Sequence, residues 1–476
     1  MRASGILMPI SALPGNAGIG TLGKCAFDFA DYARECGCTF WQVLPLHPTG
    51  FGDSPYQAFS TFAGNPYLID LDDLVSLGLL ERGEIPHFPK GRVDYGRQYR
   101  EKFRLLRLAY GRSGFLDAEI QSFSDRHYMR WLRDYALFMC LKEDRGGSWR
   151  DWERPVRERW DPHMFIVSER YMFEERFWVF VQYLFFRQFG ALKNHLARIG
   201  LKLIGDMPIY VAMDSADTWA NREIFRFRGA NPTAVAGVPP DYFSPEGQLW
   251  GNPLYRWDVL KKRGYDWWIS RVSHLAEMYD VLRVDHFRGF ESFWSVPAGA
   301  ATAREGHWEK GPGEAFLRAL PKVSYLAEDL GIITPEVRAL REKMGWPGMN
   351  VMQFAFDANA RDSLYLPHNH EKNSVSYLGT HDNDTFRGWF SALSESDRRY
   401  FSDYCGGTGR EAALRALFSS PSELVIATMQ DVLGLKKGRI NMPAIASGNW
   451  TFRLPDDSYR RETGLLRRLN RTYSRG

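Results

Sequence analysis

The feature that most limits the fold of this chain is a series of short apolar segments, which end in polar, glycine or proline residues and mostly alternate with helix-like patterns. We count eight such segments: GILMPI (5–10), TFWQVLPL (39–46), LKLIGDMPIYV (201–211), VLRVD (281–285), SYLAED (324–329), VMQFAF (351–356), SVSYLGTHD (374–382) and LVIATMQDVL (424–433). Residues 26–36 illustrate an intervening helix, with apolar residues spaced by three or four and an end at Gly37. Strands that alternate with helices predict a parallel sheet, and eight of them predict an α/β protein with a (β/α)8 TIM barrel.

The spacing of the segments locates insertions in this barrel. The chain has 476 residues, whereas such a barrel typically needs about 250. Two or three average domains would also fit this length, but we favour a single catalytic barrel over residues 1–476. We expect a mainly helical insertion at 75–190, after the second strand, because this stretch is long, helical in pattern and rich in aromatic residues.

A second insertion is expected at 212–260, after the third strand. It contains the prolines Pro232, Pro239, Pro240, Pro245 and Pro253. Such a composition favours an ordered irregular loop, which we expect to lie over the active site.

Composition excludes several classes of protein. The 61 Lys and Arg residues nearly balance 57 Asp and Glu residues, and the net charge of +4 is dispersed, which argues against a nucleic-acid partner. The longest apolar run, at 177–186, is too short to cross a bilayer, so we expect a buried helix and no membrane partner. The N-terminal residues lack a secretory pattern and the five cysteines lack framework spacing, which together favour a cytoplasmic location. Cys36 and Cys38 have no second ligand pair, so we expect structural thiols rather than a metal site.

Acidic residues end four of the predicted strands. They are Asp206 on the third segment, Asp285 on the fourth, Glu328 and Asp329 on the fifth, and Asp382 and Asp384, after His381, on the seventh. A single Asp in such a place is an ordinary turn or capping residue. Four strand ends of this kind are harder to explain by capping, and the carboxyl ends of barrel strands are where the chemistry of this fold lies.

The types of these residues indicate carboxylate chemistry on a sugar. Arg283 and Asp285 share a strand face, so we expect Arg283 to hold Asp285 ionised and to depress its pKa, as a nucleophile requires; a purely structural ion pair is the alternative. Glu328 follows the apolar residues 325–327, which raise a carboxyl pKa toward that of a general acid. One ionised and one protonated carboxyl group is the pair that retaining glycosidic-bond chemistry uses. Asp382 would bind sugar hydroxyls or stabilise positive charge on the ring.

Aromatic and amide residues support the same substrate. The stretch 52–67, directly after the second strand, contains Tyr56, Gln57 and Asn65. Sugars have apolar ring faces bordered by hydroxyl groups, so their binding sites combine aromatic rings with hydrogen-bonding side chains. A tyrosine packed in the loop is the alternative for Tyr56.

Gly18, Gly20 and Gly23 form a GxGxxG motif that suggests a nucleotide-dependent oxidoreductase. A dinucleotide site also needs an acidic residue at the end of the next strand, about 20 positions on, to bind the ribose. Here that strand ends in the residues LHP at 46–48. We therefore expect these glycines to form a tight turn.

Nearly the whole chain resembles the 4-α-glucanotransferases called amylomaltases or disproportionating enzymes, of the α-amylase superfamily. The similar blocks are SALPGNAGIGTLG, SPYQAFSTFAGNPYLIDL, GDMPIYVAMDSADTW, LWGNPLYRW, RVDHFRGF, AEDLG, GTHDNDTFRGW and GNWTFRL, in that order. The resemblance implies a (β/α)8 barrel with inserted subdomains, transfer of α-1,4-glucan segments between chains, and no cofactor. The sequence departs from the family pattern at Ala444 and Ile445, where Gly-Thr is more frequent.

The resemblance also implies roles for individual residues. Asp285 corresponds to the nucleophile, Glu328 to the acid/base, and Asp382 to the acid that stabilises the transition state. The implied substrate-binding residues are Tyr56, Asp206, Trp250, Arg283 and His381.

Three hypotheses follow. The first is a 4-α-glucanotransferase that uses α-1,4-glucans and maltooligosaccharides as donor and acceptor, as a monomer or homodimer. The second is an α-1,4-glucan hydrolase with the same three acids. The third, from a different class, is a non-catalytic glucan-binding protein, although binding alone does not require a protonated Glu opposite an ionised Asp.

Overall fold

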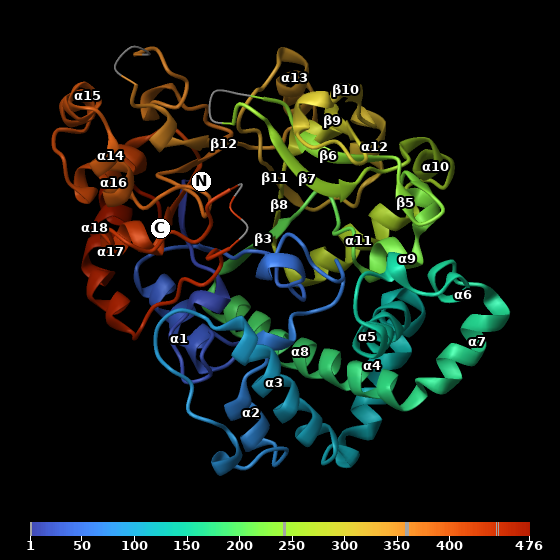
Figure 1. Ribbon diagram of the computed structural model, residues 1–476. Helices are drawn as coiled ribbons and strands as arrows, with labels where there is room; N and C mark the ends of the chain where they lie inside the picture. The colour runs from blue at the N-terminus through green and yellow to red at the C-terminus, as the bar shows by residue number, and fades with distance from the viewer. Residues whose placement is uncertain (1, 241–243, 358–360, 444, 446) are drawn as a thin grey trace.

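Eight parallel strands form the centre of the molecule in the computed structural model, which describes residues 2–240, 244–357, 361–443, 445 and 447–476 (Figure 1). The strands are β1 (Ala3–Leu7), β2 (Phe40–Gln42), β3 (Lys202–Met207), β8 (Val281–Val284), β11 (Ser324–Ala327), β12 (Gly348–Val351), β13 (Ser374–Tyr377) and β14 (Leu424–Thr428). Their order in the sheet is β11-β8-β3-β2-β1-β14-β13-β12. Where the two edge strands meet, Ala327 N donates to the carbonyl of Pro347 at 2.9 Å, so the sheet is nearly closed and the predicted TIM barrel is confirmed.

Both faces of the barrel strands are covered, which explains their nearly continuous apolar sequence. In β3 all residues after Lys202 are buried, and β13 is buried throughout. Six of the eight predicted segments contain their strand, and the first, 5–10, begins two residues after the start of β1. The sixth is misplaced by three residues: β12 ends at Val351, and Met352–Phe354 form a 3-10 helix instead. Gly348 and Asn350 interrupt the apolar pattern of the real strand, so the apolar run that follows it was mistaken for the strand.

Helices fill the long connection between β2 and β3. They are α2 (Leu71–Ser76), α3 (Tyr95–Tyr110), α4 (Asp117–His127), α5 (Arg133–Arg145), α6 (Arg154–Arg157), α7 (Asp161–Arg170) and α8 (Met172–Ile199). The apolar run 177–186 lies in α8 and is buried except at Phe186, and its polar residue Gln182 bonds the N–H and the carbonyl of Gly64 at 2.7 and 2.9 Å. This pair of bonds fastens the helix to the loop that follows β2. Within the described residues, no helix combines the length and apolarity needed to cross a bilayer.

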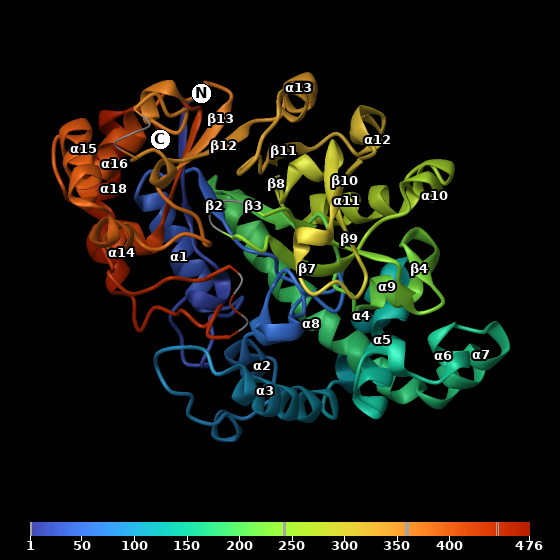
Figure 2. The ribbon, with the colours of Figure 1, turned by 45° about the horizontal axis from the view of Figure 1, so that its top comes forward.

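A second, antiparallel sheet stands beside the barrel. It has the order β10-β9-β6-β7, with β6 (Ala234–Val238), β7 (Gln248–Pro253), β9 (Ser292–Pro297) and β10 (His307–Lys310). Figures 1 and 2 show it next to β8 and β11. The expectation of an irregular loop here is wrong for β6 and β7 and for the short pair β4 (Phe227–Arg228) and β5 (Asn231–Pro232). Pro232 and Pro253 end β5 and β7, which are both edge strands, where proline is tolerated.

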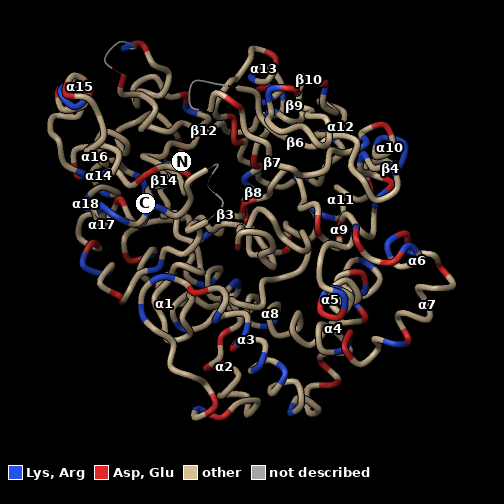
Figure 3. Tube along the Cα trace, viewed as in Figure 1, with Lys and Arg blue, Asp and Glu red and all other residues tan. Residues whose placement is uncertain are grey.

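The remaining helices lie around the barrel. They are α1 (Lys24–Glu35), α9 (Ala216–Ala220), α10 (Trp257–Lys262), α11 (Asp266–Met278), α12 (Gly313–Ala319), α13 (Pro335–Met344), α14 (Phe386–Ala392), α15 (Glu395–Cys405), α16 (Arg410–Ser419), α17 (Met429–Leu433) and α18 (Thr463–Thr472). Figure 3 shows basic and acidic residues dispersed over these elements rather than gathered by sign on one of them.

Candidate active site

A buried arginine joins two of the predicted acids. Asp206 on β3 is paired in register with Arg283 on β8. Nη1 of Arg283 donates to both carboxylate oxygens of Asp206, at 2.6 and 2.8 Å, and to Oδ1 of Asp285 at 3.0 Å. Arg283 and Asp206 are almost fully buried, whereas the Asp285 side chain is 28% exposed at the mouth of the barrel. The sharing of one cation by two acids fixes the orientation of Asp285 while leaving it accessible.

Tyr56 and His381 extend this network from the other side. The Tyr56 hydroxyl donates to Oδ2 of Asp206 at 2.7 Å and lies 2.8 Å from Nε2 of His381. Burial raises the Tyr56 pKa well above its usual value of 10, so this hydroxyl keeps its proton. Because that proton points to Asp206, the bond assigns an N–H to Nε2 of His381. The two rings stack at 5.4 Å, and the Trp450 ring packs against both.

Glu328 lies directly after β11 and is held by the backbone. Its Oε2 accepts from the N–H of His286 at 2.7 Å, and its Oε1 accepts from the N–H of Leu330 at 3.0 Å. His286 adopts a left-handed backbone conformation, with φ of 51°, at the start of the 3-10 helix Phe287–Phe290. This turn directs the His286 N–H to Glu328 and thereby links the ends of β8 and β11.

Asp382 is oriented by a loop that is remote in sequence. Nδ2 of Asn441 donates to its Oδ1 at 2.6 Å, and Nη2 of Arg439 donates to its carbonyl at 2.7 Å. Its Oδ2 lies 3.2 Å from Nε2 of His381. Asn441, Arg439 and Trp450 could not be singled out from the sequence, although the block GNWTFRL includes Trp450, because no local pattern connects residues 439–450 with the end of β13.

Trp250, on β7, borders the same cluster. Its ring meets the His286 ring edge-on at 4.8 Å and lies 6.3 Å from the Tyr210 ring. Trp250 is half-buried, so part of the ring is available to a ligand. The structure thus brings together all eight predicted site residues through direct contacts or one intervening residue.

Burial dominates the electrostatics of the acids. It raises the pKa of the Asp285 carboxyl to about 8; the carboxylates of Asp206, Glu328 and Asp382 act in the same direction, and Arg283 opposes them. The expectation that Arg283 depresses this pKa overall is therefore wrong, although its own effect has the expected sign. Burial also raises the pKa of Glu328, in the predicted direction, against Arg283 and the two backbone N–H groups. Burial lowers the His381 pKa, which favours a neutral imidazole.

Two other acids at the same rim have structural contacts. Asp329 accepts from the N–H of Met349 at 2.7 Å and forms an ion pair with Arg341 at 3.2 Å. Asp384 accepts from the N–H of Thr385 at 2.7 Å. These contacts explain why Asp329 and Asp384 lie at strand ends, so we do not count them among the candidate catalytic acids. Among the described residues, no group of three or more His, Cys, Asp or Glu side chains is arranged to hold a metal ion.

The GxGxxG glycines lie in a tightly packed turn. A Cβ on Gly20 would be 1.9 Å from the carbonyl oxygen of Ile10, and one on Gly23 would overlap the Asp70 carboxyl group. Close packing against Ile10 and Asp70 accounts for Gly20 and Gly23 without a nucleotide.

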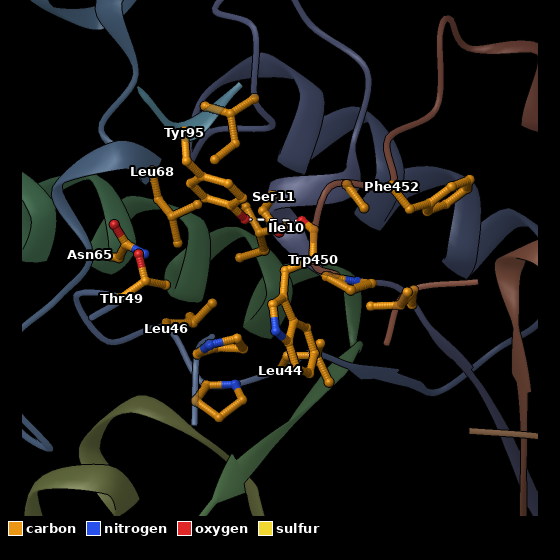
Figure 4. Close-up of a pocket in the computed structure, with 16 residues that line it drawn as sticks. Ile10, Ser11, Leu44, Leu46, Thr49, Asn65, Leu68, Tyr95, Trp450 and Phe452 are labelled. Carbon is orange, nitrogen blue, oxygen red and sulfur yellow. Dashed lines mark hydrogen bonds between the residues drawn. The ribbon is translucent and has the colours of Figure 1, made fainter. Parts of the chain in front are cut away.

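Trp450 lines a largely apolar pocket (Figure 4). It is lined by Pro9–Ala12, Ile19, Leu44–Leu46, Thr49, Pro55, Asn65, Leu68, Tyr95, Ile440, Trp450 and Phe452. The Tyr95 hydroxyl donates to the carbonyl of Trp450 at 3.0 Å across it. None of the candidate acids lines this pocket, so we place the reaction on the other side of Trp450, at the charged cluster. Ala444 lies outside the described residues; the carbonyl of its neighbour Ile445 accepts from Asn449 Nδ2 at 2.8 Å.

Comparison with known proteins gives a consistent result. A family model described as 4-alpha-glucanotransferase matches residues 8–458. The 4-alpha-glucanotransferase of Thermus thermophilus is 47% identical, over 95% of both chains, and that of Aquifex aeolicus is 41% identical over 100% of both. The structure of an amylomaltase from Streptococcus agalactiae in complex with acarbose superposes with a TM-score of 0.97 over 100% of both chains, at 36% identity.

Proposed function

Because the chain belongs to the family of 4-alpha-glucanotransferases, we propose that Asp285, Glu328 and Asp382 carry out its reaction. The enzyme transfers α-1,4-glucan segments between glucan chains. The observation that supports these three residues most strongly is the contact network from Arg283 through Asp206, Tyr56 and His381 to Asp382, which lies beside the partly exposed carboxylate of Asp285.

The first step forms a covalent glucosyl-enzyme. A carboxylate oxygen of Asp285 attacks the anomeric carbon, and the bond from that carbon to the bridging oxygen breaks. The electron pair goes to the departing oxygen, which takes the proton of Glu328. Arg283 gives Asp285 a charge-assisted hydrogen bond, whereas the donors to Glu328 among the described residues are the neutral backbone N–H groups of His286 and Leu330. Charge-assisted bonds are about twice as strong as neutral ones, so we assign the ionised state to Asp285 and the proton to Glu328.

The second step reverses the first with a new partner. The 4-hydroxyl of an acceptor glucan gives its proton to Glu328 and attacks the anomeric carbon, which releases Asp285 with net retention of configuration. Transfer exceeds hydrolysis only if water is excluded while the intermediate exists. We propose that β6 and β7, which bring Trp250 to His286, help to exclude water on this side of the catalytic cluster. Deleting part of the turn between β6 and β7 should raise hydrolysis relative to transfer; an unchanged ratio would remove this role.

The other residues bind and orient the sugar. Asp382, held by Asn441, accepts hydrogen bonds from ring hydroxyls and stabilises the positive charge that develops on the sugar. His381 and Tyr56 present polar groups beside it, and Trp250 offers a ring face for stacking. Asp206 and Arg283 act as the buried support of this arrangement.

The decisive experiment uses maltotriose as the only substrate, with products separated by chain length over time. Free glucose and a ladder of longer maltooligosaccharides, with few new reducing ends, would support the proposed roles. Glucose and maltose with rising reducing ends would indicate hydrolysis. Unchanged maltotriose would indicate glucan binding alone. Asp285→Asn should abolish the ladder while the melting temperature stays close to that of the wild type.

The state of the cysteines supports a proposal for the cellular setting. All five cysteines are free, as in proteins of reducing compartments, which supports a cytoplasmic enzyme. We expect a monomer or a homodimer in solution, which sedimentation equilibrium would distinguish, and fractionation of cells would test the location.

A further inference from the structure

The imidazole of His381 is hydrogen-bonded on one side of its ring only. Its Nε2 lies 2.8 Å from the Tyr56 hydroxyl and 3.2 Å from Oδ2 of Asp382. Its Nδ1 is buried and has no hydrogen-bond partner among the described residues. A half-turn of the ring about its Cβ–Cγ bond would put the carbon Cε1 in the place of Nε2 and remove the donor. Because no bond to Nδ1 opposes this rotation, the packing of neighbouring side chains has to fix the ring.

Two aromatic rings provide this packing. The Tyr56 ring is stacked on the His381 ring, with centroids 5.4 Å apart and planes inclined by 13°. The Trp450 ring lies 5.7 Å from the Tyr56 ring and 6.2 Å from the His381 ring, within the range of favourable ring contacts. Trp450 is 8% exposed, so water does not separate it from this pair. One indole ring therefore supports both members of the stack.

The backbone of Trp450 is held in a strained conformation. Its φ of 62° lies in the left-handed region, which is an outlier for a bulky residue. Its N–H donates to the carbonyl of Ile440 at 2.8 Å, and its carbonyl accepts from the Tyr95 hydroxyl at 3.0 Å. Strained residues of this kind persist where the surroundings hold them firmly, and they are concentrated at active sites. The two bonds fix the direction in which the indole ring leaves the chain.

Packing of the protein interior does not explain a tryptophan at this position. Trp450, Ile440 and Tyr95 all line the apolar pocket of Figure 4, so there is open space beside the side chain. Glycine would adopt the same backbone without strain. The contacts of the indole with Tyr56 and His381 give a reason for a large ring here.

We propose that Trp450 is a positioning residue that fixes the imidazole of His381, an inference that rests on the proposed function. Trp450 acts through His381, whose Nε2–H then stays directed toward Tyr56 and Asp382. Tyr95 acts one step further out, because its hydroxyl holds the carbonyl of Trp450. A polar group that is displaced from its place beside the reacting sugar loses most of its effect on the rate, so removal of the indole should lower kcat.

A double-mutant cycle tests whether Trp450 acts through His381. Trp450→Leu removes the aromatic ring, and we expect kcat with maltotriose to fall by about tenfold to a hundredfold. In a His381→Ala background there is no imidazole to hold, so the same substitution should lower kcat by less than about twofold. Equal losses in both backgrounds would show that Trp450 acts independently of His381 and would overturn the proposal. An unchanged kcat in Trp450→Leu would also overturn it.

The matched control is Trp178→Leu. Trp178 is a buried tryptophan of α8, in the helical insertion, and its ring packs against Phe103 and Tyr135. This variant should lower the melting temperature, as Trp450→Leu does, but keep the wild-type kcat at temperatures where it is folded. A fall in kcat as large as that of Trp450→Leu would identify lost stability as the cause and contradict a positioning role.

Two conservative variants refine the comparison. Trp450→Phe keeps an aromatic ring beside His381 and should retain most of the wild-type kcat. Tyr95→Phe removes only the hydroxyl that holds the Trp450 carbonyl, so kcat should fall in the same direction as in Trp450→Leu but by a smaller factor. A kcat of Trp450→Phe as low as that of Trp450→Leu would argue against ring packing as the means of positioning.

A crystal structure of Trp450→Leu without substrate gives a measurement that does not depend on turnover. We expect the His381 ring to turn or to occupy two orientations, with Nε2 beyond hydrogen-bond distance of the Tyr56 hydroxyl. A ring in its original place, with the 2.8 Å contact retained, would overturn the proposal. If instead the wild type forms no ladder from maltotriose, the proposed function itself fails, and the crystal structure still decides whether Trp450 holds His381.

Discussion

Arg283 and Asp285 lie two residues apart, and Nη1 of Arg283 donates to Oδ1 of Asp285 at 3.0 Å while it also holds both oxygens of Asp206. Its positive charge opposes the burial that raises the Asp285 pKa to about 8. We infer that the nucleophile owes its ionised fraction at neutral pH to this one side chain. Because Arg283 is buried, salt screens its effect on the Asp285 pKa only weakly.

Replacing Arg283 should therefore move the pH profile. In Arg283→Gln the Asp285 pKa rises further, so more of the nucleophile is protonated at pH 7 and the acid limb of kcat/KM shifts to higher pH. The loss of orientation adds a fall in kcat of about 100-fold. In Arg283→Lys the charge remains, so the limb should shift less. An acid limb at the same pH in both variants and the wild type would contradict the electrostatic role.

Glu328 should be needed for natural donors and dispensable for activated ones. Glu328→Gln removes the proton donor, so kcat with maltotriose should fall by about 10² to 10⁴. A maltosyl fluoride needs no proton on its leaving group and should still glycosylate Asp285, giving a fluoride burst equal to the enzyme concentration. Asp329→Asn, one residue along the chain and bonded to Met349 instead, should keep its ladder activity. A burst absent from Glu328→Gln but present in the wild type would argue against this assignment.

Two glycines should respond in opposite ways to alanine. A Cβ on Gly205, which precedes Asp206 on β3, would lie 2.3 Å from the ring of Tyr279, so the strand must shift and we expect destabilisation of about 1–3 kcal/mol. Gly190, inside α8, has no atom within 4 Å of its added Cβ, so Gly190→Ala should stabilise by about 0.5–1 kcal/mol. Differential scanning calorimetry of the two variants checks both signs. Equal melting temperatures would show that neither contact limits stability.

The barrel could be predicted from sequence because its strands are buried on both faces. A strand that is covered on both faces has a nearly continuous apolar sequence, which makes it recognisable. The order of the eight segments in the chain agrees with the order of the strands around the barrel. The error at residues 351–356 shows the limit: burial alone does not distinguish strand β12 from the buried 3-10 residues Met352 and Gln353 that follow it.

Only part of the site could be predicted in the same way. A position at the carboxyl end of a strand indicates Asp285 and Glu328 as site residues, but it indicates Asp329 and Asp384 equally. The backbone partners that give Asp329 and Asp384 a structural role are known only from the structure. Asn441 contacts Asp382 across 59 residues of sequence, with no periodicity to indicate the pairing. The antiparallel sheet and the β4–β5 pair could not be predicted, because the prolines that end β5 and β7 give this stretch the composition of a loop.

Stability should depend on the protonation of a buried acid outside the site. Burial raises the Asp217 pKa to about 7, against the N–H of Thr61 and the charge of Arg271. Because the pKa of Asp217 is higher in the folded than in the unfolded protein, protonation of Asp217 stabilises the fold. This stabilisation is complete below pH 4, and roughly 4 kcal/mol of it is lost as the pH rises to 7. Asp217→Asn should thus reduce the fall in melting temperature between pH 5 and pH 8. The exposed Asp258→Asn is the matched control, and a fall as steep as in the wild type would oppose this prediction.

Asn441 should control the orientation of Asp382 rather than substrate affinity. Its Nδ2 is 2.6 Å from Oδ1 of Asp382, and its own N–H donates to the carbonyl of His381 at 3.0 Å. Asn441→Ala removes only the side-chain bond, so Asp382 can rotate from the position it needs in the transition state. We expect kcat with maltotriose to fall by about tenfold to a hundredfold with little change in KM.

The control for Asn441 lies in the same loop. Nδ2 of Asn449 donates to the carbonyls of Met442 and Ile445, so Asn449→Ala loosens the loop without removing a contact to Asp382. Asn441→Asp places a carboxylate against Asp382, and this repulsion should lower kcat further above the pKa of the new acid than below it. If Asn449→Ala lowers kcat as much as Asn441→Ala does, the shape of the loop is what matters. If Asn441→Ala alone does so, the amide orients the acid.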